Sequence, residues 1–185
     1  KKEYEQAKEM YENLQKENEK FIDEFNRIDK INKKGGNTMK FEQLIKDRYS
    51  CRKFKNTPVE KEKIEKILEA ALVAPTACNL QPQRILVLTD KNIIKALDDE
   101  KCTRYTFDAP LIFVMCVDRS KAWTRKYDGI SSAEVDSSIA MTQMMLQAQE
   151  LGLGTTWVMA LNPDIAKKVL NIPENLDVIS FMPTG

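Results

Sequence analysis

The stretch Pro110-Leu111-Ile112-Phe113-Val114-Met115-Cys116-Val117 is an almost unbroken apolar run in a chain whose residues are 31% charged. Successive side chains of a strand point to opposite faces of its sheet, so a strand that is apolar throughout needs cover on both faces. The run therefore predicts a strand in the middle of a sheet.

The segments around this run alternate between helical and strand-like patterns, which predicts an α+β fold. Residues 134–151 form the longest predicted helix, and apolar side chains nearly encircle it, so we expect it to be buried in the core or at an interface. Further helices are predicted at residues 41–47, after Pro58 as far as Pro75, at 90–99 and at 163–170, and further strands at 84–89, 155–159 and 178–182.

Composition limits the classes of protein to which the chain can belong. The 185 residues are 42% hydrophobic and carry a net charge of +1, which is typical of a globular protein and gives no electrostatic reason to expect nucleic acid or a membrane surface as a partner. No apolar run approaches the roughly 20 residues of a membrane helix, and the charged start of the chain differs from a signal peptide. We therefore expect a cytoplasmic protein.

The chain contains no histidine, which excludes Ser-His-Asp triads, Cys-His nucleophile pairs and histidine-ligated metals. Its four cysteines, Cys51, Cys78, Cys102 and Cys116, form no Cys-x-x-Cys pair, so we expect free thiols and no metal site. The chemistry of such a chain depends on carboxylates or on a bound cofactor.

Residues 1–34 differ from the rest of the chain, because they lack proline and glycine and carry apolar residues at three- and four-residue steps. The steps fit a heptad pattern with Asn18 at an a position, which can fix the register of a two-stranded coiled coil. A single amphipathic helix docked on the body fits the pattern equally well. Residues 35–38 are predicted to form a flexible linker, and residues 39–185 the main domain.

A basic segment, Arg48-Tyr49-Ser50-Cys51-Arg52, follows the first predicted helix of the main domain. In an extended chain Arg48, Ser50 and Arg52 share a face, and two guanidinium groups beside a hydroxyl suit a phosphate or another anionic oxygen. Basic pairs are also common on solvated surfaces, so the segment alone is weak evidence for a site.

A second candidate is the loop Ala74-Pro75-Thr76-Ala77-Cys78-Asn79-Leu80-Gln81-Pro82-Gln83, which joins a predicted helix to a predicted strand. The carboxamides of Asn79 and Gln81 each offer a donor and an acceptor, which suits the edge of a flat heterocycle such as the flavin pyrimidine. An ordinary connecting loop is the alternative.

The third candidate is Gly152-Leu153-Gly154-Thr155-Thr156-Trp157-Val158, between the long helix and a predicted strand. Its glycines allow a close approach of the backbone to a neighbour. The end of the helix is a sufficient alternative explanation for Gly152.

Together and in this order, the three motifs resemble the FMN-dependent nitroreductase family. The basic segment is similar to that family's Arg-x-Ser-x-Arg, the loop to its Ala-Pro-(Ser/Thr)-Ala-x-Asn-x-Gln-Pro, and the third segment to its Gly-Leu-Gly-Thr-x-Trp. Asp108-Ala109-Pro110 before the apolar strand and Asp136 at the start of the long helix also resemble it. The resemblance covers residues 39–185 and leaves out residues 1–38.

The resemblance implies a three-layer α-β-α sandwich with a mixed, mainly antiparallel sheet. It also implies a homodimer that forms through the long helix and holds two FMN sites at its interface. By matching position, Arg48 holds the phosphate, Ser50 binds the phosphate or the ribityl end, and Arg52 lies near the flavin N1/O2 edge.

The remaining implied cofactor-binding residues belong to the second and third motifs. The partner subunit contributes Pro75, Thr76, Asn79 and Gln81, and backbone groups around Val158, Met159 and Ala160 face the flavin N5/O4 edge. Tyr49, Ala77 and Trp157 complete the implied set.

The implied activity is a ping-pong oxidoreduction in which NADH or NADPH passes hydride to flavin N5 and a small acceptor, such as a nitroaromatic or a quinone, then takes it. No catalytic acid or base is assigned, because the flavin carries the chemistry. One alternative is a non-catalytic flavin-binding or interaction module that works through the N-terminal helix. Another is a dehalogenase or dehydrogenase of the same fold, with Trp123, Arg125 and Tyr127 shaping its pocket.

The sequence ends at Gly185, directly after a predicted strand. The family continues with a segment that adds a basic phosphate contact and wraps the partner subunit. We therefore expect the sequence to be incomplete at this end, and the alternative is a weaker flavin site and a less stable dimer.

Overall fold

The computed structural model describes residues 40–185, so the predicted helical extension at 1–34 and the linker at 35–38 lie outside the described residues. The described helices are α2 (Phe41–Asp47), α3 (Lys61–Leu72), α4 (Lys91–Asp99), α5 (Ala133–Glu150) and α6 (Pro163–Leu170), with short 3₁₀ turns η1 (Ala77–Asn79) and η2 (Arg119–Lys121). The strands are β1 (Gln83–Leu88), β2 (Leu111–Val117) and β3 (Asp177–Thr184).

The three strands form an antiparallel sheet in the order β1-β2-β3, so the apolar run lies in the middle as predicted. Val114 pairs with Leu86 of β1 on one side and with Phe181 of β3 on the other. All seven residues of β2 have no solvent-accessible surface. The continuous apolar character of this strand therefore follows from its position at the centre of the core.

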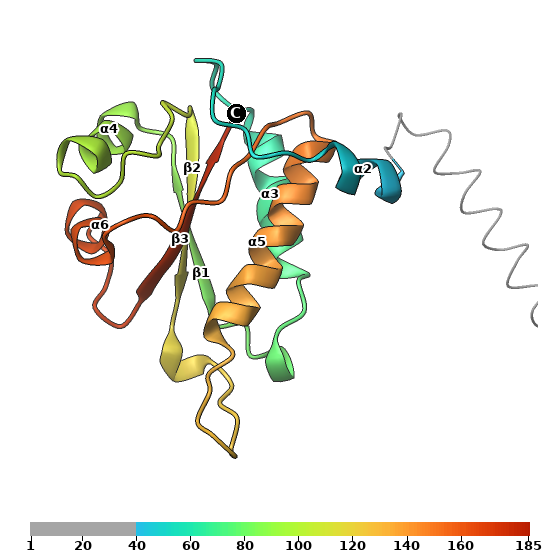
Figure 1. Ribbon diagram of the computed structural model, residues 1–185, viewed down its shortest axis with the longest axis vertical. Coiled ribbons are helices and arrows are strands. Elements are labelled where there is room, and N and C mark those ends of the chain that lie inside the picture. The colour runs from blue at the N-terminus through green and yellow to red at the C-terminus, as the bar shows by residue number, and fades with distance from the viewer. Residues whose placement is uncertain (1–39) are drawn as a thin grey trace, which may run out of the picture. The chain divides into compact units, whose positions relative to one another are not determined.

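Helices cover both faces of the sheet, with α4 and α6 on one side and α3 and α5 on the other (Figure 1). Because side chains alternate along a strand, β2 contributes to two separate apolar clusters. Ile112, Val114 and Cys116 pack with residues of α4 and α6, and Leu111, Phe113 and Met115 pack with residues of α3 and α5. The predicted three-layer α-β-α sandwich is confirmed.

The helix ends follow from local capping. The Asp90 side chain accepts a hydrogen bond from Asn92 N at the start of α4. At the start of α6 the Asn162 side chain accepts hydrogen bonds from Asp164 N and Ile165 N, and Pro163 needs no acceptor because proline has no N–H group. α3 ends at Leu72, ahead of Pro75, because a proline disfavours a helical conformation in the residue before it. Within residues 40–185 no helix has the length and apolar character that a membrane span requires.

The predicted strand at residues 155–159 is wrong as a regular strand. The backbone from Gly154 to Val158 runs antiparallel to β3, with isolated bridges from Thr155 to Thr184 and from Val158 to Phe181. Beyond Val158 a tight turn, in which Leu161 N donates to Met159 O, ends the pairing. On its other side Thr155 forms a parallel bridge with Ser50, so the extended sheet is mixed and mainly antiparallel.

Candidate functional site

The basic segment at residues 48–52 lies against the stretch that follows α5. Cys51 N donates to Thr155 O at 2.9 Å, which fixes the two backbones side by side. A Cβ placed on Gly154 would lie 2.8 Å from Cys51 Cβ, well inside contact distance, so only glycine permits this approach. The predicted close approach is therefore confirmed at Gly154. Gly152 has open space around it and a φ of +76°, which fits its alternative role as the end of α5.

The side chains of the basic segment leave polar groups without partners. Arg48 Nη1 is buried and has no hydrogen-bond partner, and the Ser50 hydroxyl forms no hydrogen bond within residues 40–185. Arg52 is exposed, and its Nη1 donates to Ser50 O at 3.3 Å. A buried guanidinium N–H without an acceptor is costly, and an anionic oxygen bound beside Ser50 would remove that cost. The exposed Tyr49 instead directs its hydroxyl to Cys51 Sγ.

The loop at residues 74–83 has an unusual backbone. Cys78, Asn79 and Gln81 have φ values of 52°, 54° and 47°, in the left-handed region that residues other than glycine seldom adopt. Three such residues within four positions persist only where surrounding contacts hold them, and such strain is concentrated at ligand sites. The backbone therefore supports a binding function over an ordinary connection.

Asp136 is the main anchor of this loop. Its side chain is only 2% exposed; Oδ1 accepts a hydrogen bond from Ala77 N at 2.9 Å, and Oδ2 accepts one from Ser132 Oγ at 2.7 Å. The sequence marked Asp136 only as part of the family pattern, and its role as an anchor was missed. An acidic residue in the first turn of a helix is common enough to give no separate signal.

The side chains of Thr76, Gln81 and Gln83 are hydrogen-bonded within the chain, and that of Asn79 is free. Gln81 N donates to Thr76 Oγ1, and Gln81 Nε2 donates to Leu72 O, each at 3.1 Å. The carboxamide of Asn79 is exposed and forms no hydrogen bond within residues 40–185. Asn79 is therefore the side chain of this loop that is best placed to bind a ligand.

The stretch Trp157 to Ala160 presents its backbone rather than its side chains. Trp157 and Val158 pack into the two apolar clusters, and both backbone polar groups of Val158 bond to Phe181. Met159 and Ala160 are exposed, and neither of their N–H groups donates to another group within residues 40–185. These two free donors fit the acceptor atoms at the edge of a flavin ring.

The two halves of the candidate site lie at opposite ends of α5. The loop contacts the first turn of the helix through Asp136, and the basic segment lies beside the stretch that follows its last residue, Glu150 (Figure 1). At 1.5 Å per residue, the helix from Asp136 to Glu150 is about 21 Å long. Within one chain, the structure therefore does not bring Asn79 to Arg48.

Both arginines of residues 119–132 are already paired with carboxylates of the same chain. Arg119 forms ion pairs with Glu134 and Asp177, and the hydrogen bond from Arg119 holds the pKa of Glu134 below its usual value. Arg125 donates to both carboxylate oxygens of Asp128, at 2.8 and 2.6 Å, in a hairpin whose Tyr127 is 97% exposed. The guanidinium of Arg125 is thus not free to bind an anionic substrate in this arrangement.

Three comparisons with known proteins agree with this geometry. A crystal structure of a nitroreductase family protein from Clostridium difficile 630 superposes with a TM-score of 0.75 at 44% identity, over 80% of this chain and 84% of that one. An FMN-dependent nitroreductase from Clostridium difficile R20291 superposes with a TM-score of 0.66 at 30% identity, over 77% and 84% of the two chains. A protein of Methanothermobacter thermautotrophicus, provisionally named an NADH dehydrogenase/NAD(P)H nitroreductase, is 31% identical over 77% of this chain and 75% of its own length.

The sequence pattern of the nitroreductase family matches this chain at residues 45–106 and 100–185, and so includes the basic segment, the loop and the stretch after α5. The match extends over most of the residues that the structure describes. The chain belongs to the nitroreductase family.

Proposed function

We propose that this protein is an FMN-dependent oxidoreductase that takes hydride from NADH or NADPH and passes it to a small acceptor such as a nitroaromatic or a quinone. The observation that carries the proposal is the buried, unpartnered Nη1 of Arg48, two residues before Ser50 in the segment that runs alongside Thr155. The free backbone donors of Met159 and Ala160 follow Thr155 along the same stretch. The resemblance to an FMN-dependent nitroreductase and to a protein named for NAD(P)H supports the choice of cofactors.

The spacing of these groups fits an elongated ligand. Thr155 pairs with Ser50, and the chain then runs extended as far as Val158, three residues later, where the turn at Met159 begins. At about 3.3 Å per residue this extended part is about 10 Å long. Arg48 and Ser50 would hold the phosphate at one end, and the N–H groups of Met159 and Ala160 would orient the ring at the other. Bound FMN would supply the redox chemistry, since its N5 accepts and donates hydride.

The rest of the proposed site lies around the ring. Arg52 is exposed, and its positive charge would stabilise negative charge at the N1/O2 edge. Asn79 would read the pyrimidine edge with its free carboxamide, whereas Pro75, Thr76, Ala77 and Gln81 would shape the loop that presents it. Tyr49 and Trp157 would support the segments that carry these groups.

A homodimer would complete this site. The loop with Asn79 lies about 21 Å along α5 from the basic segment, so a second copy of the chain must supply it. The outer face of α5 exposes Val135 and Ile139, and α2 exposes Phe41 and Ile45. Exposed apolar side chains on neighbouring helices are typical of an interface between subunits. We therefore place two FMN sites at the interface of a dimer formed through α5.

The Arg48→Ala variant tests the phosphate site. Removing a charge-assisted contact should cost about 1–3 kcal/mol, which corresponds to FMN binding that is about 5- to 150-fold weaker. Binding can be followed by the quenching of FMN fluorescence on titration with protein. Lys168→Ala, which removes an exposed cation from α6, serves as the matched control and should leave the affinity unchanged. Equal affinities for the two variants would remove Arg48 from the site.

Anaerobic stopped-flow mixing tests the activity. FMN-loaded protein should lose its visible flavin absorbance on mixing with NADH or NADPH much faster than free FMN does, and a panel of acceptors should restore it. Protein that stays colourless after incubation with FMN contradicts the proposal. Bound flavin that is reduced no faster than free FMN supports the alternative of a non-catalytic module.

We expect the working protein in the cytoplasm, where the exposed thiol of Cys78 stays reduced.

A further inference from the structure

A pocket of about 670 Å³ lies between the segment that follows α4 and the segment that precedes α6. Met159 and Ala160 form one wall, and these residues carry the free backbone donors described above. The opposite wall consists of Lys101, Cys102, Thr103, Arg104 and Tyr105, none of which belongs to the three motifs. The pocket therefore opens beside the place where the proposed hydride transfer occurs.

Hydrogen bonds hold the two walls at a fixed separation. Asn162 N donates to Cys102 O at 2.7 Å, and the buried hydroxyl of Thr103 donates to Ala160 O at 2.9 Å. Thr103 Oγ1 also accepts from Tyr105 N at 3.1 Å, which fixes the start of the next turn. Side chains on residues 101–105 are thus presented from a backbone that is tied directly to residues 160–162.

The second wall carries two cations that are not paired with any acid in the described part of the chain. Lys101 and Arg104 are exposed and take part in none of its ion pairs, unlike Arg119 and Arg125. Asp98 also lines the pocket, so two positive side chains and one negative one leave a formal charge of +1. Lys101 has a φ of 59°, a conformation that glycine adopts more readily at the end of a helix. The backbone that presents the Lys101 side chain is therefore in an energetically unfavourable conformation.

An aromatic ring lies beside these cations. The guanidinium of Arg104 is 5.8 Å from the centroid of the Tyr105 ring, and this ring is 37% exposed. Tyr105 packs in turn against Phe107, with 5.9 Å between the ring centroids. A flat ligand can therefore stack on an aromatic surface while its anionic group reaches Arg104 or Lys101.

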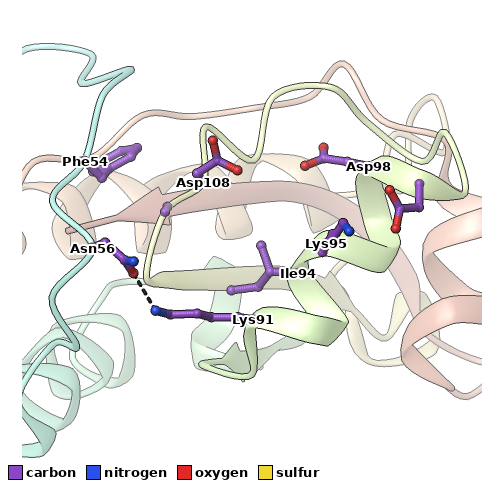
Figure 2. Close-up of a pocket in the computed structure, with 9 residues that line it drawn as sticks. Phe54, Asn56, Lys91, Ile94, Lys95, Asp98 and Asp108 are labelled. Carbon is purple, nitrogen blue, oxygen red and sulfur yellow. Dashed lines mark hydrogen bonds between the residues drawn. The ribbon is translucent and has the colours of Figure 1, made fainter.

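A neighbouring pocket of about 500 Å³ gives a useful contrast (Figure 2). It lies between α4 and the segment that carries Phe54 and Asn56, and its Lys91 donates to the side chain of Asn56. Its two lysines face three carboxylates, of Asp98, Asp99 and Asp108, so its formal charge is −1. It contains none of the candidate flavin residues, and its composition does not favour an anion.

We infer that Lys101 and Arg104 form an anion clamp that binds the negatively charged oxygens of the substrate, with Tyr105 against its ring, where that substrate exchanges hydride with the flavin edge that Met159 and Ala160 would orient. The inference rests on the proposed function, since it assumes that the reactive edge lies at these two residues. The ligand class is a planar ring that carries an anionic group. Both the phosphates of a nicotinamide dinucleotide and the carboxylate of an aromatic acceptor have this chemistry.

Equilibrium binding to the FMN-loaded full chain tests the clamp without turnover. The ligands are 4-nitrobenzoate, its neutral analogue 4-nitrobenzamide and NADP⁺, each titrated by calorimetry in the absence of a reductant. The double variant Lys101→Gln/Arg104→Gln should bind at least one of the two anions about tenfold more weakly, and it should bind 4-nitrobenzamide as the parent protein does. The matched control Lys95→Gln, from the acidic pocket, should leave all three affinities unchanged.

The pattern of losses identifies the source of the anion. A loss confined to NADP⁺ assigns the clamp to the dinucleotide, a loss confined to 4-nitrobenzoate assigns it to the acceptor, and a loss of both shows that it serves both. Unchanged binding of both anions, or an equal loss for 4-nitrobenzamide, overturns the inference. If the chain binds no FMN, the proposed function fails, and the same titrations on the flavin-free protein still decide whether the clamp exists.

Discussion

The substitution Gly154→Ala addresses the contact that holds the basic segment in place. The added Cβ would lie 2.8 Å from Cys51 Cβ and 2.9 Å from Cys51 Sγ, whereas nonbonded carbon atoms pack at about 3.5–4.0 Å. No rotamer of Cys51 relieves the contact with its Cβ, because that atom is fixed to the backbone. The segment that carries Arg48 must therefore move away from Thr155 by about 0.7 Å or more.

The cost of this movement can be estimated in two ways. Overpacking of this kind lowers the free energy of unfolding by about 1–3 kcal/mol, which corresponds to a fall in Tm of roughly 3–12 °C. If the proposed FMN site is correct, the displacement should also weaken the contact of Arg48 with the phosphate and reduce FMN affinity about tenfold. Thermal unfolding of the flavin-free protein and fluorescence titration with FMN measure the two effects separately.

Two further variants make the result decisive. Gly152→Ala meets no atom within 4 Å but has a φ of +76°, so it should lower the stability by about 1–2 kcal/mol while leaving FMN affinity intact. Cys51→Gly combined with Gly154→Ala removes the close contact and should restore part of the lost affinity, as a favourable coupling in a double-mutant cycle. The reasoning is refuted if Gly154→Ala binds FMN as tightly as the parent chain does.

Three other predictions concern the anchor, the thiols and the surface ion pairs. Asp136→Ala leaves buried donors without their acceptor, so it should lower the free energy of unfolding by about 2–3 kcal/mol and speed hydrogen exchange in residues 74–83, which mass spectrometry can follow. In native protein iodoacetamide should label exposed Cys78 but not Cys116, because burial shields that thiol and raises its pKa to about 11. Arg119 lowers the pKa of Glu134, so their pairing stabilises the fold at neutral pH, and this contribution disappears as the pH falls through the lowered pKa. Arg119→Gln should reduce the free energy of unfolding by less than about 1 kcal/mol at pH 7. Chemical unfolding at several pH values should show that the variant loses less stability in acid than the parent chain does.

The fold was predictable from the sequence wherever burial imposes a regular pattern. The helix predicted at 134–151 is observed at Ala133–Glu150, and the helix predicted at 163–170 has the same bounds in the structure. The apolar run of β2 indicated its central position because only a strand covered on both faces can be apolar throughout. The prediction of a strand at 155–159 was wrong because β propensity describes single residues and does not indicate over how many residues a neighbouring strand stays paired with them. In the structure the turn at Met159 ends the pairing with β3.

The candidate site was predictable only in part. The order of the motifs pointed to Arg48, Asn79 and the stretch after α5. Residue types alone, however, do not show which polar groups are already hydrogen-bonded within the fold. Gln81 and Asn79 offer the same carboxamide, and only the structure shows that Gln81 Nε2 is bonded to Leu72 O. The pocket wall with Arg104 has no periodic pattern, because its residues are brought to Ala160 by tertiary hydrogen bonds alone.

The long helix α5 connects the core, the loop anchor and the outer surface. Its inward face buries Met141 and Met144 against β2, its first turn holds the loop through Asp136, and its outer face exposes Ile139. Apolar residues all around a helix are compatible with either a core or an interface, and here one face is buried in the core while another leaves Ile139 exposed. A change on the outer face, such as Ile139→Lys, should therefore leave the folding of the monomer intact. If the proposed dimer is correct, the same change should weaken FMN binding, because each flavin would depend on a loop that only the second copy can supply.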